Sequence, residues 1–425
     1  MTALPDPLPI RARGPLEARI RVPGSRSITN RALVASALAS GESRLEGAAS
    51  SDDTEVMRKG LCALGVRIAV DSDAWTVGGV GGRFAAPRDT LDAGASGTTA
   101  RFLTAAATLA AGPVVIDGTP RMRERPIQEL VDALRALGAD CEAQSPGGCP
   151  PVRVAGGGLP GGSANIDARR SSQYVSGVLL AAPYADRDVE ISFVGGVLVS
   201  RPFVDLTLEV MRAFDAQASW DGEGLHVRAG CPYRPRVYPI EPDAQSAVYG
   251  FAAAAIAGGR VRIDGIPAES RQTDLLFLEA LASMGCRVER KPDAVEVRGP
   301  EHTLRGVEID MNAMPDAALA LAVVALFAEG PTTIRNIANL RIKETDRLAA
   351  LETQLRKLGG MATAGPDWLR IEPAPLHGAT IDTYDDHRIA MAFALAGLSV
   401  PGVAIRDPGC VSKTWPNYFD VLERL

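Results

Sequence analysis

The stretch LVASALASGESRLEG (residues 33–47) decides the fold, because its pattern occurs in six copies along the chain. An Ala- and Leu-rich segment of helical character ends at a small or turn residue, and a β-branched strand and a second turn follow. The other copies are LTAAATLAAGPVVIDG (103–118), VLLAAPYADRDVEISFVGG (178–196), FAAAAIAGGRVRIDG (251–265), ALAVVALFAEGPTTIRN (320–336) and AFALAGLSVPGVAIRD (392–407). The residues that end the helix patterns lie 71 to 74 residues apart, at Gly41, Gly112, Asp186, Gly258, Gly330 and Gly402.

A second pattern follows the first in five of these units: an amphipathic helix, a glycine or a substitute, a strand, a turn and another strand. LASMGCRVERKPDAVEVRGP (281–300) is one example. A glycine after a helix suits a left-handed cap, and alternating polarity suits half-buried strands. The sixth copy stops at the helix pattern NYFDVLERL (417–425). We expect the N-terminal strand patterns PIRARG (9–14) and LEARIRV (16–22) to complete this last unit.

The chain is longer than one hydrophobic core usually serves, which predicts two domains. Units one to three occupy about residues 24–240, and units four to six occupy about 241–425 together with 1–23. Crossings with Pro and Gly near 21–24 and 238–242 are the expected hinges. Because the repeat is longer than the roughly 20–50 residues of solenoid repeats, we expect two compact pseudo-symmetric α/β lobes around a cleft.

Composition and charge exclude several classes of function. A net charge of −6 argues against nucleic acid or an anionic membrane as a partner. The N-terminus lacks the apolar core of a signal peptide, and the longest apolar run, 317–328, is too short to span a bilayer. We therefore expect a cytoplasmic protein. Six cysteines without a CxxC pair and four scattered histidines predict neither a metal site nor a disulfide framework, and no nucleotide or cofactor motif is present.

Polar clusters stand just before the six helix patterns. The free N–H groups and the dipole of a helix N-terminus attract anions. Units that begin alike can direct several such sites to one place, which predicts an anionic substrate. The clusters lie at 27–31, 96–101, 171–173, 243–246, 316 and 386–388.

Three segments of the first domain are candidate parts of this site. In PGSRSITNRAL (23–33), Ser27 can cap a helix flanked by Arg26 and Arg31, although a capped helix with solvated arginines is an equal reading. The Gly97 segment SGTT lets backbone N–H groups approach an anion, and RMRERP (121–126) contains three arginines. SSQ (171–173) can bind a polyol or phosphate. The alternatives are an ordinary turn, a solvated charged face and a helix cap.

The second domain supplies carboxylates as well as cations. Asp316 is expected in the first turn of an apolar helix, and Lys343, Glu344 and Arg347 within about one helical turn. The alternatives are a carboxylate that complements the helix dipole and an i,i+3 surface pair. His387 and Arg388 enter another apolar helix, and Lys413 lies in a loop. Clustered cations can hold phosphates and carboxylates, and a carboxylate pair among them can serve as base and acid.

Taken in order, these motifs resemble the 5-enolpyruvylshikimate-3-phosphate synthase (3-phosphoshikimate 1-carboxyvinyltransferase) family from about residue 17 to the end. The matching segments are PGSRSITNRA, SGT, RMRERPI, SSQ, VSRPFVD, MPDAA, KETDRL, DDHR and SKTWPNYF. The resemblance implies two lobes of three βαβαββ units each, an inside-out α/β barrel that closes over its substrates. It also implies transfer of the enolpyruvyl group of phosphoenolpyruvate to the 5-hydroxyl of shikimate 3-phosphate, with release of phosphate, on the route to chorismate and aromatic amino acids.

The resemblance assigns roles to individual residues. Shikimate 3-phosphate is expected to contact Arg26, Ser27, Arg31, Ser171, Ser172, Gln173, Ser200, Asp316, Asn339 and Lys343. Phosphoenolpyruvate is expected to contact Arg26, Gly97, Arg125, Gln173, Arg347, Arg388 and Lys413. Asp316 is the expected base, Glu344 the group that moves the C3 proton, and His387 its support, while Lys413 offsets developing negative charge. No cofactor, a monomeric state and glyphosate as inhibitor are also implied.

Three positions depart from the family pattern, and two other functions stay open. Arg26 stands where Lys is usual, Ala95 where Asn is usual and Phe203 where Tyr is common. One alternative is the related UDP-N-acetylglucosamine enolpyruvyl transferase, although TPRMRERPI (119–127) lacks that family's reactive cysteine. The other is a non-catalytic phosphate-binding relative, against which the retention of Asp316, Glu344 and Lys413 argues.

Overall fold

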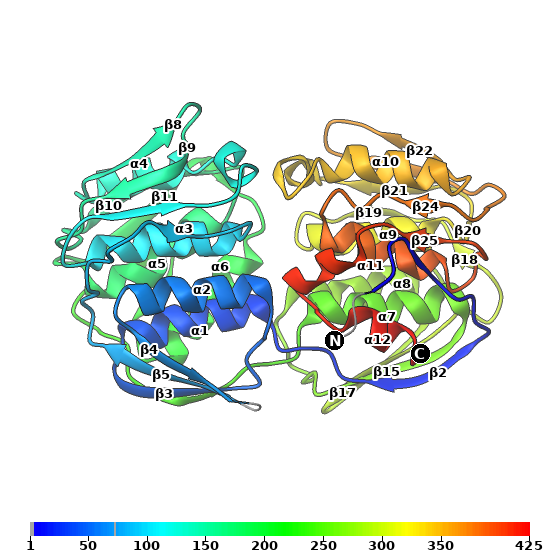
Figure 1. Ribbon diagram of the computed structural model, residues 1–425, viewed down its shortest axis with the longest axis horizontal. Helices are drawn as coiled ribbons and strands as arrows, with labels where there is room; N and C mark the ends of the chain where they lie inside the picture. The colour runs from blue at the N-terminus through cyan, green and yellow to red at the C-terminus, as the bar shows by residue number, and fades with distance from the viewer. Residues whose placement is uncertain (1–3, 72–73) are drawn as a thin grey trace. The chain divides into compact units, whose positions relative to one another are not determined.

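The computed structural model describes residues 4–71 and 74–425. The chain divides into two compact units, Gly24–Ile240 and Met1–Pro23 with Glu241–Leu425 (Figure 1). Helices alternate with short strands throughout both units. None of the helices in the described ranges is long and apolar enough to cross a membrane.

The unit Gly24–Ile240 contains three four-stranded sheets of one design. In the first, β14 (Val237–Pro239) pairs in parallel with β3 (Ser40–Glu46), and β5 (Ala74–Val80) joins β3 to β4 (Arg67–Val70) in antiparallel pairs. The same order and directions recur in the other two sheets. These contain β6 (Leu91–Asp92), β7 (Val114–Asp117), β9 (Cys149–Val154) and β8 (Cys141–Ser145), and β10 (Gly162–Ala168), β11 (Val189–Leu198), β13 (Gly224–Val227) and β12 (Ala218–Asp221).

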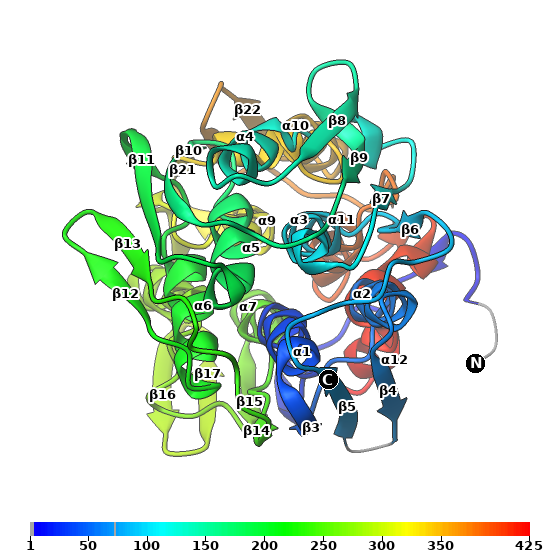
Figure 2. The same cartoon turned by 90° about the vertical axis from the view of Figure 1, so that its left-hand side faces the viewer.

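The first helix of each repeat lies in the interior of this unit. α1 (Arg26–Leu38), α3 (Gly97–Ala106) and α5 (Gln173–Ala181) contact one another, and Figure 2 shows them surrounded by the strands of the three sheets. α1 is buried from Ile28 to Leu38, because its many small side chains let neighbouring helices approach on every side. The second helices are amphipathic and partly exposed: α2 (Asp52–Ala63), α4 (Gln128–Ala136) and α6 (Pro202–Ala213).

The other unit repeats this arrangement. Its inner helices α7 (Ala244–Ala257), α9 (Ala318–Ala325) and α11 (His387–Ala396) contact one another. Its outer helices are α8 (Phe277–Ser283), α10 (Arg347–Lys357) and α12 (Tyr418–Leu422). The sheets have the orders β2-β15-β17-β16, β19-β21-β23-β22 and β24-β25-β1, with a separate pair β18-β20. The strands are β1 (Leu8–Pro9), β2 (Leu16–Ile20), β15 (Gly259–Asp264), β16 (Arg287–Lys291), β17 (Ala294–Arg298), β18 (Leu304–Arg305), β19 (Glu308–Asp310), β20 (Ala328–Glu329), β21 (Thr332–Arg335), β22 (Met361–Ala364), β23 (Leu369–Glu372), β24 (Thr380–Ile381) and β25 (Ala404–Ile405).

The prediction that both N-terminal strand patterns complete the sixth repeat is wrong for the second of them. β1 does pair with β25 of the sixth repeat, but β2 pairs in parallel with β15 and completes the fourth. β14, which precedes the fourth repeat in sequence, pairs with β3 of the first. In each repeat, the strand after the first helix pairs with a parallel neighbour. The two segments that cross between the units supply this neighbour for two repeats: β2 pairs with β15, and β14 pairs with β3. A Cβ at Gly259 would lie 2.1 Å from the Leu16 carbonyl oxygen, so this pairing requires glycine.

Not every predicted helix end coincides with the helix end in the structure. Gly258 caps α7 with φ 75°, a conformation that favours glycine. α1, however, ends at Leu38, and Gly41 lies inside β3. The repeat spacing therefore locates the start of each following strand more reliably than the last helical residue.

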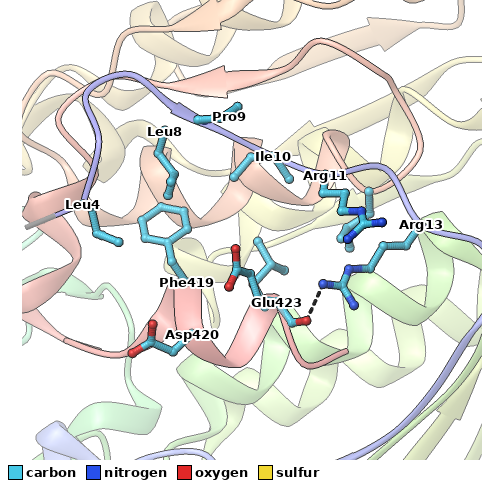
Figure 3. A pocket seen from close by; sticks show the side chains of 11 residues that line it. Leu4, Leu8, Pro9, Ile10, Arg11, Arg13, Phe419, Asp420 and Glu423 are labelled. Carbon is cyan, nitrogen blue, oxygen red and sulfur yellow. Dashed lines mark hydrogen bonds between the residues drawn. The ribbon is translucent and has the colours of Figure 1, made fainter. Parts of the chain in front are cut away.

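The N-terminal segment packs against the C-terminal helix. Leu8 and Ile10 line a small cavity of about 60 Å³ together with Phe419 and Leu422 of α12 (Figure 3). The Arg13 guanidinium donates to the carbonyl of Glu423 at its edge. Apolar contacts and this hydrogen bond hold the two chain ends together within one unit.

Candidate functional site

The start of α1 places two predicted arginines in different surroundings. The helix begins at Arg26 and its cap is Ser25, whose hydroxyl accepts from the Ile28 N–H at 3.4 Å. The prediction that Ser27 caps this helix is therefore wrong, because Ser27 already lies in the first turn. Arg26 Nη1 lies 2.8 Å from Asp53 Oδ2 at the start of α2.

Arg31 is 3% exposed and is held by neutral oxygens. Its Nε donates to Thr207 Oγ1 at 2.7 Å, and its Nη2 donates to the Phe203 carbonyl at 3.0 Å and to Ser176 Oγ at 3.3 Å. Within the described ranges it forms no ion pair with a carboxylate, and burial lowers its pKa to about 9. A buried cation held only by neutral groups is electrostatically suited to an incoming anion. The alternative of a solvated arginine is therefore excluded for Arg31.

The α3 start brings Gly97 and Arg125 into contact. Ser96 caps the helix, and Arg125 Nη1 donates to the carbonyl of Ala95 at 3.3 Å. A Cβ at Gly97 would lie 2.6 Å from Arg125 Nη2, so the glycine makes room for the guanidinium. Gln173, from α5, donates to Thr98 Oγ1 at 3.1 Å. The starts of α3 and α5 thus meet.

The three arginines of RMRERP are not equivalent. Arg125 is 9% exposed, whereas Arg121 and Arg123 carry exposed side chains that pair with Glu124 and Asp117. The alternative of a solvated charged face therefore holds for Arg121 and Arg123. Only Arg125 remains a candidate ligand in this segment.

The serines of this unit lie at the ends of secondary structure. Ser172 occupies the N-cap position of α5, and its side chain makes no capping hydrogen bond there, while Ser171 Oγ accepts from the Gln173 N–H at 3.2 Å. Ser200, between β11 and α6, is buried with φ 51°. A left-handed serine costs about 1–3 kcal/mol and is held in place by its surroundings. Such strain is frequent at binding sites.

Arg347 is the centre of the charged cluster in the other unit. It is 1% exposed and is the first residue of α10. Its Nη1 lies 2.8 Å from Asp316 Oδ1, its Nη2 lies 2.8 Å from Glu344 Oε2, and its Nε lies 2.7 Å from Asp386 Oδ2. The reading of Glu344 and Arg347 as a surface pair is therefore wrong. The expectation of a shared helical turn is also wrong, because Glu344 precedes the helix.

Arg388 is the second buried cation of this cluster. Its Nη2 donates to Gln245 Oε1 at 2.6 Å and lies 3.3 Å from Asp316 Oδ2, and its Nη1 donates to the Tyr249 hydroxyl at 3.4 Å. Burial alone would lower the pKa of Arg347 and of Arg388, but the neighbouring carboxylates outweigh it and raise both. Both guanidinium groups therefore stay charged.

Asp316 forms ion pairs with both Arg347 and Arg388. It lies in a short 3₁₀ turn, Pro315–Ala317, directly before α9. Burial would raise its pKa, but the charges of Arg388, Lys343 and Arg347 prevail and hold the pKa well below its usual range. The helix-dipole alternative does not account for these three cations. In this arrangement Asp316 is ionised and is a weak base.

The remaining predicted residues surround this cluster. Lys413 Nζ donates to Glu344 Oε1 at 2.7 Å, and Lys343 Nζ lies 4.0 Å from Asp316 Oδ1. His387 is 1% exposed, with Nδ1 3.8 Å from Asp386 Oδ1. Asn339 lies in a 3₁₀ helix, Ala338–Ile342, and its buried Oδ1 has no hydrogen-bond partner among the described residues. Asp316, Glu344 and Asp386 thus lie in one cluster with Arg347, Arg388, Lys343 and Lys413, in which each cation contacts at least one carboxylate.

Sequence reasoning missed several residues that position the predicted ones. Asp386 caps α11 and pairs with Arg347, although it stands inside the quoted DDHR motif. Gln245 joins Arg388 to Asp316, while Ser176 and Thr207 hold Arg31. The cap position could have indicated Asp386. Gln245 lies in the predicted polar cluster 243–246, but its role was not predicted. Ser176 and Thr207 are polar residues on buried helix faces, which only the packing reveals.

The described part of the chain shows no cluster of three or more His, Cys, Asp or Glu side chains that could hold a metal ion. All six cysteines are free thiols.

The family model for EPSP synthase (3-phosphoshikimate 1-carboxyvinyltransferase) matches residues 10–422. The chain belongs to the EPSP synthase family. It is 44% identical over 408 residues to the 3-phosphoshikimate 1-carboxyvinyltransferase of Nostoc punctiforme, covering 95% of each chain. It is 46% identical over 413 residues to the enzyme of the same name from Methanoculleus marisnigri, covering 96% of this chain and 97% of that one.

Solved structures share the fold. An EPSP synthase structure from Acinetobacter baumannii superimposes with a TM-score of 0.83 at 26% identity, covering 98% of this chain and 97% of that one. The enolpyruvyl transferase NikO from Streptomyces tendae superimposes with a TM-score of 0.79 at 22% identity, covering 99% and 98%. The predicted enolpyruvyl transferase fold is confirmed.

Proposed function

We propose that the residue groups at the helix starts of each unit serve one reaction and divide it between anion binding and proton transfer. By its family, the protein is a 3-phosphoshikimate 1-carboxyvinyltransferase of aromatic amino-acid biosynthesis. It transfers the carboxyvinyl group of phosphoenolpyruvate to the 5-hydroxyl of shikimate 3-phosphate and releases phosphate. The assignment of residues to these steps is our proposal.

Arg31 supports the proposed site for shikimate 3-phosphate. It is a buried guanidinium held by Thr207, Ser176 and the Phe203 carbonyl, so a bound phosphate would meet a cation that is already oriented. The contact from Phe203 comes from its backbone, so it does not depend on a tyrosine at this position. We assign to the same substrate Arg26, Ser27, Ser171, Ser172, Gln173, Ser200, Asp316, Asn339 and Lys343.

Gly97 and Arg125 support the proposed site for phosphoenolpyruvate. The close approach of Arg125 to Gly97 places a guanidinium beside the free N–H groups at the start of α3. Arg125 is fixed by the carbonyl of residue 95, a contact that Ala95 supplies as well as an asparagine does. Arg26, Gln173, Arg347, Arg388 and Lys413 complete the proposed set.

The observation that carries the proton-transfer proposal is that Arg347 and Arg388 both bind Asp316. In the family reaction the 5-hydroxyl adds to C2 of phosphoenolpyruvate while C3 is protonated, and the tetrahedral intermediate then loses phosphate from C2 and a proton from C3, which restores the double bond. When the carboxylate and phosphate of phosphoenolpyruvate draw these two cations away, Asp316 loses two of the three charges that hold its pKa low, and only Lys343 remains. We propose that substrate binding thereby makes Asp316 a competent base for the 5-hydroxyl proton.

Glu344 is the proposed carrier of the C3 proton. It contacts Arg347 through one oxygen and Lys413 through the other, so two cations fix its carboxyl group in one orientation. We propose that His387, buried beside Asp386, supports this transfer, and that Lys413 and the arginines offset the negative charge of the departing phosphate. We further propose that the protein is a cytoplasmic monomer that needs no cofactor and is inhibited by glyphosate.

Phosphate release tests the proposed function. Purified protein with phosphoenolpyruvate and shikimate 3-phosphate should release phosphate continuously, with glyphosate competing against phosphoenolpyruvate. UDP-N-acetylglucosamine in place of shikimate 3-phosphate should give no release. If phosphate is released with UDP-N-acetylglucosamine and phosphoenolpyruvate but not with shikimate 3-phosphate, the related transferase is favoured. If neither acceptor gives release, a binding protein is favoured.

A further inference from the structure

Gln245 connects the two charged groups that the proposed mechanism uses most. This residue lies in the first turn of α7 and is 7% exposed. Its Nε2 donates to Asp316 Oδ2 at 3.4 Å, and its Oε1 accepts from Arg388 at 2.6 Å. An amide has one donor end and one acceptor end, so this pairing works in only one of its two orientations. A half-turn of the amide would place an NH₂ group against the Arg388 guanidinium.

Asp274 lies behind this amide. It belongs to the 3₁₀ segment Thr273–Leu276, which packs against α7 and α8, and it is 4% exposed. Gln245 forms a side-chain hydrogen bond with its carboxyl group. Asp274 Oδ1 has no hydrogen-bond partner in the part of the chain that the structure describes. A buried carboxyl oxygen without a donor is costly, which indicates a role other than stability.

The charges that face Asp274 come from several elements. Asp243, the cap of α7, and Asp316, before α9, are both acidic, whereas Arg388 on α11 is basic; Glu279 on α8 is exposed. Burial and the negative charge of Asp316 raise the pKa of Asp274 to about 7, and Arg388 opposes this rise. Asp274 therefore changes charge close to neutral pH.

We propose that Asp274 is a positioning residue that sets the orientation of Gln245, and through it the geometry of Arg388 and Asp316. An ionised Asp274 can only accept, so it holds the amide nitrogen of Gln245 and leaves the amide oxygen to Arg388. A protonated Asp274 can donate, and a half-turn of the Gln245 amide would bring the amide oxygen to that donor. Protonation thus competes with Arg388 for Gln245 and loosens the cation assigned to phosphoenolpyruvate.

The inference rests on the proposed function, and pH profiles test it. As the pH falls below about 7, we expect kcat/KM for phosphoenolpyruvate to decrease in the wild type. The wild-type profile should contain one ionisation that the profile of Asp274→Asn lacks. Substrate ionisations are common to both proteins and cancel in the comparison. The amide that replaces the carboxyl group has no charge to lose, so this variant should keep turnover within roughly tenfold at pH 8. Asp293→Asn, on an exposed turn, is the matched control and should keep the wild-type profile.

A double-mutant cycle tests whether Asp274 acts through Gln245. Gln245→Met keeps the side-chain length but removes the hydrogen bonds, so it should abolish the same ionisation, and adding Asp274→Asn should change nothing further. Identical profiles for wild type and Asp274→Asn, or additive effects of the two changes, would overturn the inference. NMR titration of the Asp274 carboxyl needs no turnover: a pKa near 7 supports the inference and one below about 5 overturns it. Absent turnover in the wild type would instead overturn the proposed function.

Discussion

Arg347 Nη1 lies 2.8 Å from Asp316 Oδ1, and this ion pair joins the start of α10 to the turn before α9. The pair is buried and shares its members with Glu344, Asp386 and Arg388. Three carboxylates around two guanidinium groups leave the cluster with nearly balanced charge. Its arginines are therefore compensated by protein carboxylates, whereas Arg31 in the other unit is compensated by none among the described residues. Under the proposed function, an incoming anion would compete with Asp316 in one unit, and at Arg31 in the other it would meet no competing acid among the described residues.

Asp316→Asn should lower kcat by about 100-fold or more while shikimate 3-phosphate still binds. The amide keeps the shape of the side chain but cannot take the hydroxyl proton. Steady-state kinetics give kcat, and calorimetry gives the affinity for shikimate 3-phosphate. Turnover near that of the wild type would remove Asp316 from the role of base.

Glu344→Gln should also lower kcat by about 100-fold or more, for a different reason. The variant retains hydrogen bonds to Arg347 and Lys413 but cannot deliver a proton to C3. With both substrates at saturating concentration, incorporation of solvent deuterium at C3 should still fall with turnover, which separates this defect from impaired binding. If the exchange rate is unchanged, another group carries the proton. Glu352→Gln, whose exposed partner is Arg356, is the control.

Gly97→Ala should raise KM for phosphoenolpyruvate with little change in thermal stability. The added methyl group would lie 2.6 Å from Arg125 Nη2, and the flexible end of that side chain can move away. Arg125 then leaves the position in which it is proposed to bind the substrate. Gly14→Ala, which meets no atom within 4 Å, is the control. An unchanged KM would show that Arg125 does not bind phosphoenolpyruvate in its present position.

Arg31→Met should remove most of the thermal stabilisation that shikimate 3-phosphate gives the wild type. A ligand at 100 times its Kd stabilises by about 2.7 kcal/mol, so the wild-type shift is readily measured by calorimetry. The ligand-free variant should unfold at a similar temperature, because the substitution removes a buried charge along with its hydrogen bonds. Arg121→Met, at an exposed pair, should keep the full shift. A full shift in Arg31→Met would show that the phosphate binds elsewhere.

The effect of pH on Arg31 has a defined sign. Burial lowers its pKa from the usual range of a guanidinium group to about 9 in the folded chain. Folding therefore disfavours the charged form, so the cost in stability is fully present below about pH 9 and is relieved as the pH rises above that value. At neutral pH the full cost remains, and the phosphate proposed to bind there would offset it.

The sequence by itself determined the six repeats, the place of the helix starts and the family. These depend on local patterns: small apolar residues make a helix that can be buried on all sides, and a polar cluster before it marks its first turn. The order of motifs from PGSRSITNRA to SKTWPNYF was sufficient to predict the enolpyruvyl transferase fold. The pairing of β2 and β14 could not be predicted in the same way, because strand pairing is not local. β2 precedes the first repeat but pairs with the fourth, and β14 precedes the fourth but pairs with the first.

Only the tertiary structure decided which polar residues act together. Asp316 and Glu344 were expected near arginines, but sequence spacing could not show that Arg347 binds both, since 31 residues separate Arg347 from Asp316. Nor could it separate buried Arg125 from exposed Arg121 and Arg123, which share one short segment. Gln245 stood in the predicted polar cluster 243–246 but without a role of its own, and Asp274 gave no signal, because a buried amide or acid acquires its role from the charges that packing places beside it. Electrostatic energy depends on distance and burial, and both are properties of the folded chain.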